Sequence, residues 1–396
     1  MSASVTSAVA TRPVAVPRIG LFTTGHFTND LYGNMMPVLM PVIAAQLGFS
    51  LSAAALLFTI YSFTSSIVQP YLGHLADRSG AVSIAPIGVV LSALGGALVA
   101  VAPNYATLVV LAVVGGIGVA AYHPQAAAMV VSFAGPYRAM VMSIYLLGGS
   151  IGFAIGPLLI TGVADYAGLN MTPILLVPGI VVAALLYWFA PRDWNPRSGQ
   201  SLSLWQVIRD NRRVLGLLVL IVAIRSVAQT GLTFFLPFYF AREGLASGEY
   251  ARIVAAFLFT GAFGGIIGAY IADRWLGRTR VMVAELFISS LFMLLMLFSS
   301  GILIWVWTAL AGITLLGSWS LLTVRGQELM PANVGMASGI MLGLSIGLGG
   351  LTVSPLGFLA EAVGVPPVLV GLAALPPLAG LLALKLPRRP GVGRVS

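Results

Sequence analysis

The residues best suited to chemistry in this sequence are His26 and Asp30, which stand four positions apart in the apolar run 19–46. Residues four apart share one face of a helix, and a run of this length can cross a bilayer, which takes about 20 residues. An ionised carboxylate at bilayer depth is costly, so it normally faces a bundle interior or a water-filled cavity. We expect this helix to line a transport route, with Asp30 handling a proton or a charged substrate. The alternative is a buried Asp30 that only pins a neighbouring helix by hydrogen bonds.

Two further ionisable residues, His123 and Arg225, lie inside apolar runs at a similar depth. Asp30 and Arg225 each lie about 16 Å from the cytoplasmic ends of their runs, and the two histidines lie about 10 and 13 Å deep. Equal depth and opposite charge predict an Asp30–Arg225 pair in at least one state. Both histidines are further candidates for proton coupling, although His123 could equally be a core histidine bonded to a neighbouring helix. Glu285 lies shallower and is expected to pair with the basic segment 274–280.

Other chemistry is not indicated by the sequence. It contains no cysteine, which excludes disulfides and thiolate metal sites, and its 3 histidines lie on separate segments without a metal-binding spacing. A phosphate-binding loop does not occur, which argues against ATP hydrolysis. Paired carboxylates, a nucleophile triad and a metal cluster are also missing from the sequence pattern, so we expect no enzyme activity, no cofactor and no metal site.

The composition is that of a polytopic membrane protein. Of the 396 residues, 59% are hydrophobic and only 8% are charged, and the mean hydropathy is +1.00. No soluble fold needs so much apolar surface. The 46 glycines suit close helix approach in lipid. The net charge of +9 could indicate nucleic-acid binding, but its placement along the chain indicates membrane orientation. We therefore expect a lipid bilayer, and no nucleic acid, among the partners.

Apolar runs of about 20 residues predict an all-α membrane protein with twelve transmembrane helices. The expected spans are 19–46, 51–75, 81–102, 105–132, 138–164, 172–190, 214–241, 250–272, 280–300, 303–326, 334–359 and 365–386. A polar, basic linker at 191–213, with a short surface helix at 204–213, separates an N-terminal six-helix bundle, 19–190, from a C-terminal one, 214–386. Residues 1–18 are expected to form a disordered cytoplasmic tail, since they lack the apolar core of a signal peptide, and 387–396 to form a second tail.

The distribution of basic residues predicts how the chain is oriented. With the N-terminus in the cytoplasm, all but three of the 20 Lys and Arg fall on the cytoplasmic side. The exceptions are Arg225, which lies within a span, and Arg242 and Arg252, which lie outside. This is the positive-inside bias, so both termini are expected in the cytoplasm.

The two halves of the sequence repeat at a nearly constant offset. A shift of 196 residues places Asp77 on Asp273, and a shift of 195 places Ser143 on Ser338. Repeats on either side of a central linker indicate two six-helix bundles of the same topology. This pattern resembles the parallel repeat of the major facilitator superfamily, which implies a substrate site between the bundles near the midplane.

Both copies of an Asp-Arg pair lie in motifs that resemble the cytoplasmic G-x-x-x-D-R-x-G-R-R signature of that superfamily. The resemblance implies loops with a gating role, formed by Gly73, Asp77, Arg78 and Gly80 in the first copy and by Asp273, Arg274, Gly277 and Arg278 in the second. An Asp there can pair with a nearby Arg and lie at a helix N-terminus, where the dipole favours an anion. Such contacts can hold the bundles in one state and break in the other. The first copy lacks the trailing basic residues, which predicts a weaker contact.

A glycine-rich segment at 148–157 resembles the antiporter motif of facilitator exporters, whose core is G-x-x-x-G-P. Glycines four apart also allow close crossing of helices. A packing face of small residues is therefore as good an interpretation of this segment as an antiport signature.

Four segments resemble a narrower family, the fosmidomycin-resistance type of bacterial drug exporter. They are Gly25-His26-Phe27 with Asp30 and Tyr32, then Gln69-Pro70, Tyr122-His123-Pro124-Gln125, and 331–339. The sequence departs from the family at Gln125, where the family pattern has Glu, so one candidate proton carrier is missing. The resemblance implies a multi-pass protein of the bacterial inner membrane.

We expect a monomeric secondary transporter that exports small amphipathic or anionic organic compounds, such as drugs or antibiotics, in exchange for protons. The candidate substrate-binding residues are Arg225, which would suit an anionic group, Gln125, Tyr32, Asn34, Gln229, Phe235 and Trp319. Two alternatives remain open, namely proton-coupled uptake or facilitated transport of a metabolite, and a membrane receptor that does not transport.

Overall fold

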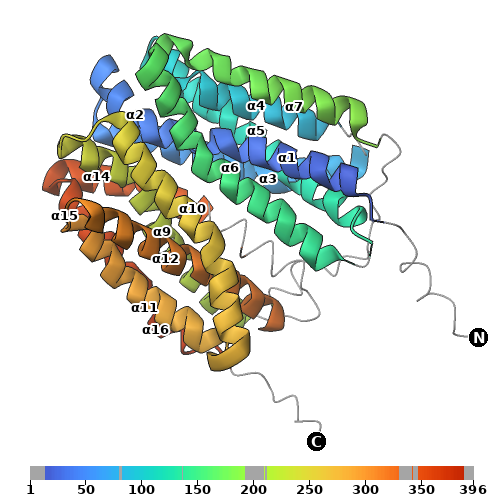
Figure 1. Cartoon of the computed structure of the whole chain (residues 1–396), viewed down its shortest axis with the longest axis vertical. Coiled ribbons are helices and arrows are strands. Elements are labelled where there is room, and N and C mark those ends of the chain that lie inside the picture. The colour runs from blue at the N-terminus through green and yellow to red at the C-terminus, as the bar shows by residue number, and fades with distance from the viewer. Residues whose placement is uncertain are drawn as a thin grey trace, which may run out of the picture. The chain divides into compact units, whose positions relative to one another are not determined.

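The computed structural model of the protein describes residues 14–79, 83–135, 137–191, 209, 212–329, 341 and 347–387. Within these ranges the backbone forms helices and short connections, and no strand (Figure 1). The prediction of an all-α protein is therefore confirmed for the described part of the chain.

The helices follow one another with short connections. The first half of the chain contains α1 (Val16–Gly33), α2 (Met35–Leu47), α3 (Leu51–Ser79), α4 (Ile84–Ala97), η1 (Val99–Val101), α5 (Tyr105–Ser132), α6 (Arg138–Ala167), η2 (Leu169–Leu175) and α7 (Leu176–Phe189). The second half contains α9 (Arg212–Arg242), α10 (Ser247–Ile271), η3 (Ala272–Leu276), α11 (Arg278–Leu297), α12 (Ile302–Leu329), α14 (Val353–Val363), α15 (Val365–Ala373) and α16 (Leu375–Ala383).

Local sequence explains several helix ends. The Asn104 side chain accepts a hydrogen bond of 2.9 Å from the backbone N–H of Thr107 and so caps the start of α5. Gly48, with a φ of 69°, ends α2, and Gly277, with a φ of 79°, precedes α11. These left-handed conformations suit glycine because a Cβ atom would be strained there.

Nine helices in the described part of the chain are long and apolar enough to cross a membrane, and Ile84–Ala97 and Gly347–Val363 are shorter apolar helices. The predicted first span, 19–46, is instead two helices, because the backbone leaves the helical region at Asn34 (φ −113°, ψ 8°). Pro37 lacks the backbone N–H that would bond to the Gly33 carbonyl in a continuous helix, which favours a break here. The total of twelve spans and the cytoplasmic location of the termini stay predictions.

The chain divides into two compact units. The first comprises Met1–Phe49 and Ile60–Ser198, and the second comprises Ser50–Thr59 and Gly199–Ser396. Helix α3 therefore begins in the second unit and continues in the first, which the sequence pattern does not reveal. The predicted bundle limits stay predictions. Most of the predicted surface helix, of the linker and of both tails lies outside the described residues. Arg212 and Arg213 belong to α9, and residues 16–18 of the predicted N-terminal tail belong to α1 and are helical.

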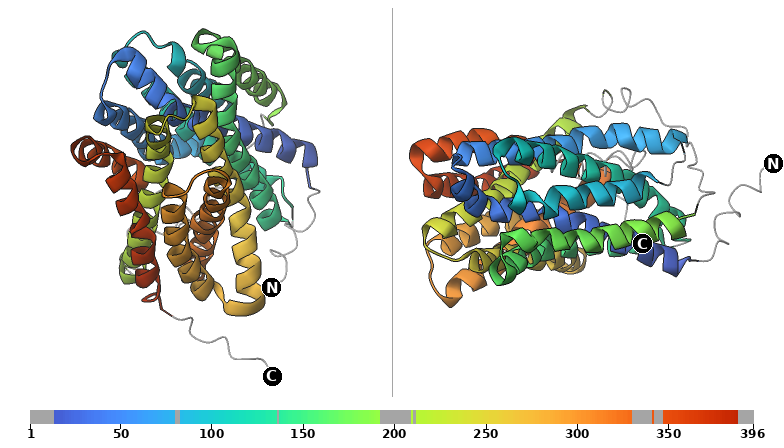
Figure 2. Two further views of the ribbon diagram at one scale, coloured as in Figure 1. Left: turned by 60° about the vertical axis from the view of Figure 1, so that its left-hand side comes forward. Right: turned by 90° about the horizontal axis from the view of Figure 1, so that it is seen from above.

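In the first unit, α1 packs along α6 and also contacts α4 and α5, while α4 packs against α5 and α7 (Figures 1 and 2). Small residues allow these helices to approach closely. At the crossing of α4 and α5, a side chain on Gly95 would overlap the backbone of Gly115. Phe22, Tyr122 and Tyr145 lie in the apolar core of this unit. Helices α4, α5, α6 and α7 thus hold α1 in place and orient the face that carries its polar residues.

In the second unit, α12 packs against α10 and α11, and α9 packs against α15 and α16. The core of this unit includes Leu218, Met282 and Leu321. Two ionisable residues are buried within it, Arg225 on α9 and Glu285 on α11.

Candidate functional site

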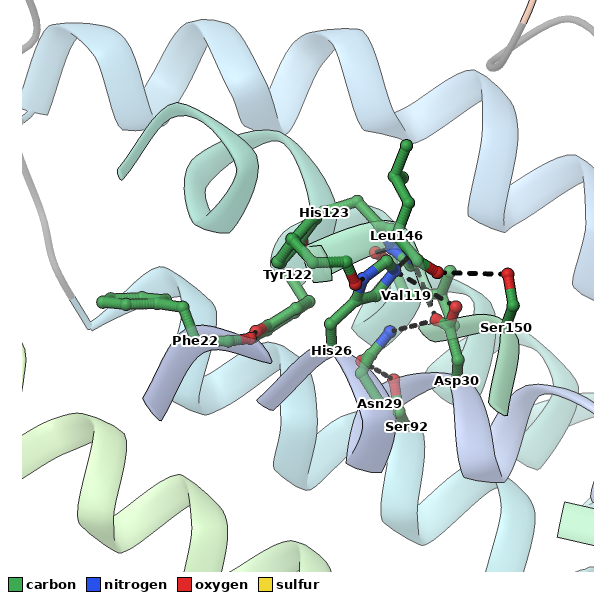
Figure 3. A network of polar contacts seen from close by, with 11 residues as sticks. Phe22, His26, Asn29, Asp30, Ser92, Val119, Tyr122, His123, Leu146 and Ser150 are labelled. Carbon is green, nitrogen blue, oxygen red and sulfur yellow. Dashed lines mark hydrogen bonds and ion pairs between the residues drawn. The ribbon is translucent and has the colours of Figure 1, made fainter. Parts of the chain in front are cut away.

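His26 and Asp30 of α1 meet His123 of α5 in the interior of the first unit (Figure 3). His26 Nε2 lies 3.1 Å from Asp30 Oδ2, His123 Nε2 lies 3.1 Å from Asp30 Oδ1, and the two Nε2 atoms are 3.2 Å apart. We call these three residues the His–Asp–His cluster. His26 is only 4% exposed, whereas Asp30 is 18% and His123 23% exposed, so the cluster is accessible through the latter two.

Backbone carbonyls orient both imidazole rings of the cluster. His26 Nδ1 lies 2.8 Å from the carbonyl oxygen of Tyr145, and His123 Nδ1 lies 2.8 Å from that of Val119. A carbonyl oxygen only accepts hydrogen bonds, so each Nδ1 carries the hydrogen and each Nε2 of a neutral ring is an acceptor. Two Nε2 atoms and a carboxylate would then face one another as acceptors alone. This arrangement therefore requires at least one hydrogen, or another cation, between them.

A chain of polar contacts extends the cluster to α4. Asn29 Nδ2 donates to Asp30 Oδ1 at 3.4 Å, and the Ser92 hydroxyl donates to Asn29 Oδ1 at 2.7 Å (Figure 3). Asn29 and Ser92 are buried. Sequence reasoning missed both residues, although the position of Asn29 beside Asp30 in an apolar run was an available signal.

Helix α6 completes the cluster with an aromatic ring and a space. The Tyr145 ring stacks on His26 with centroids 4.1 Å apart and an interplanar angle of 20°. A Cβ atom on Gly149 would collide with the His26 ring and would lie 2.7 Å from Asp30 Oδ2. The glycine-rich segment predicted as an antiporter motif or a packing face thus faces α1, and Gly149 leaves the room that the cluster occupies.

The residue types of the cluster also suit a metal ion. Imidazole nitrogens and carboxylate oxygens are common ligands of zinc and related ions, and the ligand atoms here lie within 4.8 Å of one another. Sequence spacing does not indicate such a set, because His123 is 97 positions from His26. The cluster can therefore bind a proton or could hold a metal ion.

Arg225 lies in the second unit and is 1% exposed. Its Nε donates to the Leu315 carbonyl at 3.2 Å and to the Ser318 hydroxyl at 3.0 Å, and its Nη2 donates to the same carbonyl at 2.9 Å. The guanidinium carbon lies 5.6 Å from the ring centroid of Trp319, within the range of a cation–π contact. Asp30 and Arg225 each have other partners here, so their mutual pairing stays a prediction for another state.

The prediction that Glu285 pairs with the basic segment 274–280 is wrong. Glu285 is 8% exposed, and the charged group that acts on it is Arg225. The physical reason lies in the helix: α11 begins at Arg278, so Glu285 is about two turns inside it. Its carboxylate turns toward α10 and α12, where it lies against Gly268 and Gly317.

Two predicted substrate-binding residues hold the first unit together. Gln125 is 1% exposed, and its Oε1 accepts a hydrogen bond of 2.7 Å from the backbone N–H of Ala85 in the first turn of α4. The Tyr32 hydroxyl donates to the Leu175 carbonyl at 2.6 Å and so ties α1 to η2. A part for either residue in substrate binding stays a prediction.

The other predicted substrate-binding residues differ in burial and in hydrogen bonding. Asn34 is buried, and its Nδ2 has no hydrogen-bond partner. Gln229 is half-buried. Phe235 is fully buried and packs edge-on against Phe234 with centroids 5.0 Å apart. Trp319 donates from Nε1 to the Met341 carbonyl at 3.2 Å.

The second copy of the gating signature forms a charged network. Asp273 Oδ1 accepts from Arg278 Nε at 3.2 Å and lies 3.0 Å from its Nη2. Arg278 also pairs with Glu328 of α12, which pairs with Arg325 at 2.9 Å. Asp273 and Arg274 lie in a π-helical turn, not in a loop, because the helix continues to Leu276 and ends at Gly277. The expected Asp–Arg contact is thus present in this copy.

The first copy of the signature is also helical where the structure describes it. Helix α3 continues to Ser79 and includes Gly73, Asp77 and Arg78, so the prediction of a loop is wrong for these positions. Gly80 lies outside the described residues, as do the side chains of Asp77 and Arg78.

Sequence comparisons place this geometry among transporters. The family model of the Major Facilitator Superfamily matches residues 22–354. The uncharacterized MFS-type transporter YfnC of Bacillus subtilis (strain 168) is 28% identical over 375 residues, which cover 91% of this chain and 90% of the relative. The fosmidomycin resistance protein of Escherichia coli (strain K12) is 25% identical over 378 residues, which cover 93% of this chain and 92% of that relative. The resemblance to the fosmidomycin-resistance type is thereby confirmed.

Solved structures share the fold. A bacterial homologue of the human lysosomal transporter Spinster superposes with a TM-score of 0.78 at 16% identity, covering 96% of this chain and 100% of that chain. The nucleoside transporter NupG gives a TM-score of 0.78 at 11% identity, covering 94% and 100%. Together with the family match over most of the chain, these findings show that the protein belongs to the Major Facilitator Superfamily and is a multi-pass membrane transporter.

Proposed function

We propose that the protein is a proton-coupled secondary transporter that exports small amphipathic or anionic organic compounds by alternating access. It would act as a monomer in the bacterial inner membrane, with twelve spans and both termini in the cytoplasm. The observation that carries this proposal is the convergence of His26 Nε2, His123 Nε2 and the Asp30 carboxylate within 3.2 Å of one another.

The cluster supports proton coupling because the arrangement of its three acceptor groups favours a bound proton. A hydrogen on either Nε2 can be shared with the other ring or with Asp30, and the positive charge of the imidazolium balances the carboxylate. If the helices that carry these residues separate, the three acceptor groups no longer repel one another. A bound proton then stabilises the cluster less. Proton affinity then differs between conformations, which is what coupling requires. In this mechanism an imidazole binds the proton and Asp30 supplies the countercharge.

Export of drug-like compounds is supported by the names of relatives. One is the fosmidomycin resistance protein of Escherichia coli. Another is the putative multidrug resistance protein MdtD of Pectobacterium atrosepticum, which is 28% identical over 181 residues covering 45% of this chain. We propose that Arg225, beside Trp319, interacts with an anionic group of the substrate. Asn34 and Gln229 are the next candidates, because Asn34 Nδ2 is buried without a hydrogen-bond partner and Gln229 is half-buried.

The two gating signatures complete the proposed cycle. The pair formed by Asp273 and Arg278, together with Glu328, links η3 and α11 to α12. We propose that this contact, and its counterpart at Asp77 and Arg78, forms in one state and breaks in another. Ion pairs at helix ends suit such a role because their exchange with water costs little.

The test uses purified protein in proteoliposomes with a panel of candidate compounds and an imposed pH gradient. The wild type should accumulate substrate against its gradient in exchange for protons. Asp30→Asn should lose accumulation driven by the pH gradient but retain substrate exchange at equal pH. Asp165→Asn is the matched control, because it makes the same change at an exposed position in the same unit.

Each outcome of this experiment has a defined meaning. Accumulation by Asp30→Asn equal to that of the wild type would refute the coupling role of the cluster. Flux in the direction of the proton gradient would indicate the uptake symporter instead, and binding without counterflow would indicate a receptor. A chelator such as EDTA should leave transport unchanged. Loss of transport in the presence of the chelator would show that the cluster works with a metal ion rather than a proton.

A further inference from the structure

Glu285 occupies a niche that three helices of the second unit form around its carboxylate. A Cβ atom on Gly268 of α10 would overlap Glu285 Oε1, and one on Gly317 of α12 would lie 3.2 Å from the same oxygen. Either side chain would crowd the acid, so the two glycines leave the space that it fills. A carboxyl group is thus built into the interior of the bundle, at a depth where an acid is costly.

Both Glu285 and Arg225 have a buried polar atom without a hydrogen-bond partner. These atoms are Glu285 Oε2 and Arg225 Nη1. The two side chains contact the same turn of α12, since Arg225 bonds to Leu315 and Ser318 while Glu285 lies against Gly317. They interact electrostatically but do not form an ion pair in this structure.

Arg225 of α9 is the charged residue that acts on Glu285 among the described residues. In η3, which packs against α11, Asp273 and Arg274 are both exposed. Helix α10 presents Gly268, α12 presents Gly317, and the sequences of α15 and α16 contain no ionisable residue. Arg325 of α12 pairs with Glu328, and Arg278 at the start of α11 pairs with Asp273 and Glu328. The state of Glu285 therefore depends on its relation to Arg225.

An ionised carboxylate that is buried without a hydrogen bond is strongly disfavoured and takes up a proton instead. A guanidinium does not lose its proton in a protein, so Arg225 stays charged. A direct Arg225–Glu285 contact would stabilise the ionised acid through charge-assisted hydrogen bonds. Such a contact would also give a hydrogen-bond partner to each of the two unpartnered atoms, Glu285 Oε2 and Arg225 Nη1.

We propose that Glu285 is a second proton-binding site, separate from the His–Asp–His cluster. It holds a proton in the arrangement described here and releases it when Arg225 turns to pair with it. The inference rests on the proposed proton-coupled transport and assigns an additional proton to the second unit.

The first test is infrared difference spectroscopy of the purified protein between low and high pH. The wild type should show the carbonyl band of a protonated carboxylic acid that disappears as the pH rises. The band should be absent from Glu285→Gln and present in Glu243→Gln, an exposed acid of the same unit that serves as the control. Arg225→Gln should retain the band to higher pH, because the cation that stabilises the ionised acid is gone. Glu285→Asp keeps an acid in the niche and should show a shifted band.

The second test measures protons exchanged per substrate from the reversal of flux in proteoliposomes. Glu285→Gln should lower that number by one relative to the wild type, and Glu243→Gln should leave it unchanged. An unchanged ratio together with an unchanged infrared spectrum would overturn the inference. A wild type without any proton coupling would overturn the proposed function instead, and the infrared experiment would still decide whether Glu285 binds a proton.

Discussion

Replacing Gly149 with Ala should disable the His–Asp–His cluster while leaving the fold intact. The new Cβ atom would enter the space between α6 and α1, where it would collide with the His26 ring and lie 2.7 Å from Asp30 Oδ2. Tyr145 stacks on His26 and the Tyr145 carbonyl holds its Nδ1, so the histidine has little freedom to retreat. The His26 ring, whose Cε1 and Nε2 would lie 2.4 Å from the new atom, must therefore be displaced from these contacts, and Asp30 must retreat as well.

The size of that movement follows from the distances. An ordinary contact needs a separation of about 3.4 Å, so Asp30 Oδ2 must retreat by about 0.7 Å and the His26 ring by about 1.0 Å, which displaces both partners of their 3.1 Å contact. Overpacking of this kind costs about 1–3 kcal/mol, and a helical Gly→Ala change returns about 0.5–1 kcal/mol. The net loss of stability should therefore not exceed about 2.5 kcal/mol.

The assay compares transport driven by a pH gradient with substrate exchange at equal pH, in proteoliposomes of matched protein content. Gly149→Ala should lose most of the transport driven by the pH gradient and keep most of the substrate exchange at equal pH. Gly162→Ala is the control, because Gly162 lies on the same helix and a Cβ atom there meets nothing within 4 Å. Thermal unfolding in detergent checks that both variants are folded.

Full gradient-driven accumulation by Gly149→Ala would refute the reasoning, since the crowded cluster could not then be the coupling site. Equal losses in Gly149→Ala and Gly162→Ala would also refute it, because the effect would belong to the helix and not to the cluster.

Three further predictions test other parts of the structure. Asp77→Asn and Asp273→Asn should lower turnover but leave substrate affinity within a few fold, and a large loss of equilibrium binding in both folded variants would argue against a gating role. Arg225→Ala should reduce folding yield more than the double change with Asp30→Asn, because the single change leaves the Asp30 carboxylate as an unpaired midplane anion, and strict additivity would argue against a direct pair. Gln125→Leu should lower the free energy of unfolding by about 0.5–2 kcal/mol, since it removes the acceptor that caps α4. Gln125→Glu keeps an acceptor and should remain within the wild-type range in the same unfolding measurement.

The sequence alone determined the helical class of the chain and the limits of several helices. The predicted span 105–132 coincides with α5, and 138–164 lies within α6. The reason is that a backbone in lipid must satisfy its own hydrogen bonds, so a long apolar run can hardly form anything but a helix. The pairing of His26 with Asp30 was also predictable, because a spacing of four fixes their common face.

Tertiary packing decided which residues meet. The sequence indicates similar depths for His26 and His123, but only the packing of α1, α5 and α6 brings their Nε2 atoms to 3.2 Å. Tyr145 and Gly149 gained their roles from facing α1, which no periodic pattern of apolar residues specifies. In lipid all sides of a helix are apolar, so hydropathy does not say which side meets a neighbour.

The same limit explains the corrections in the second unit and at the cytoplasmic signatures. Glu285 stands near basic residues in sequence, yet rotation about the α11 axis turns it toward Gly268 and Gly317. Motif residues 73–79 read as a loop because they are polar, yet the backbone continues α3. Composition thus determines where helices can form. The close fit of small residues between helices determines how each helix is rotated, and hence which buried charges face each other.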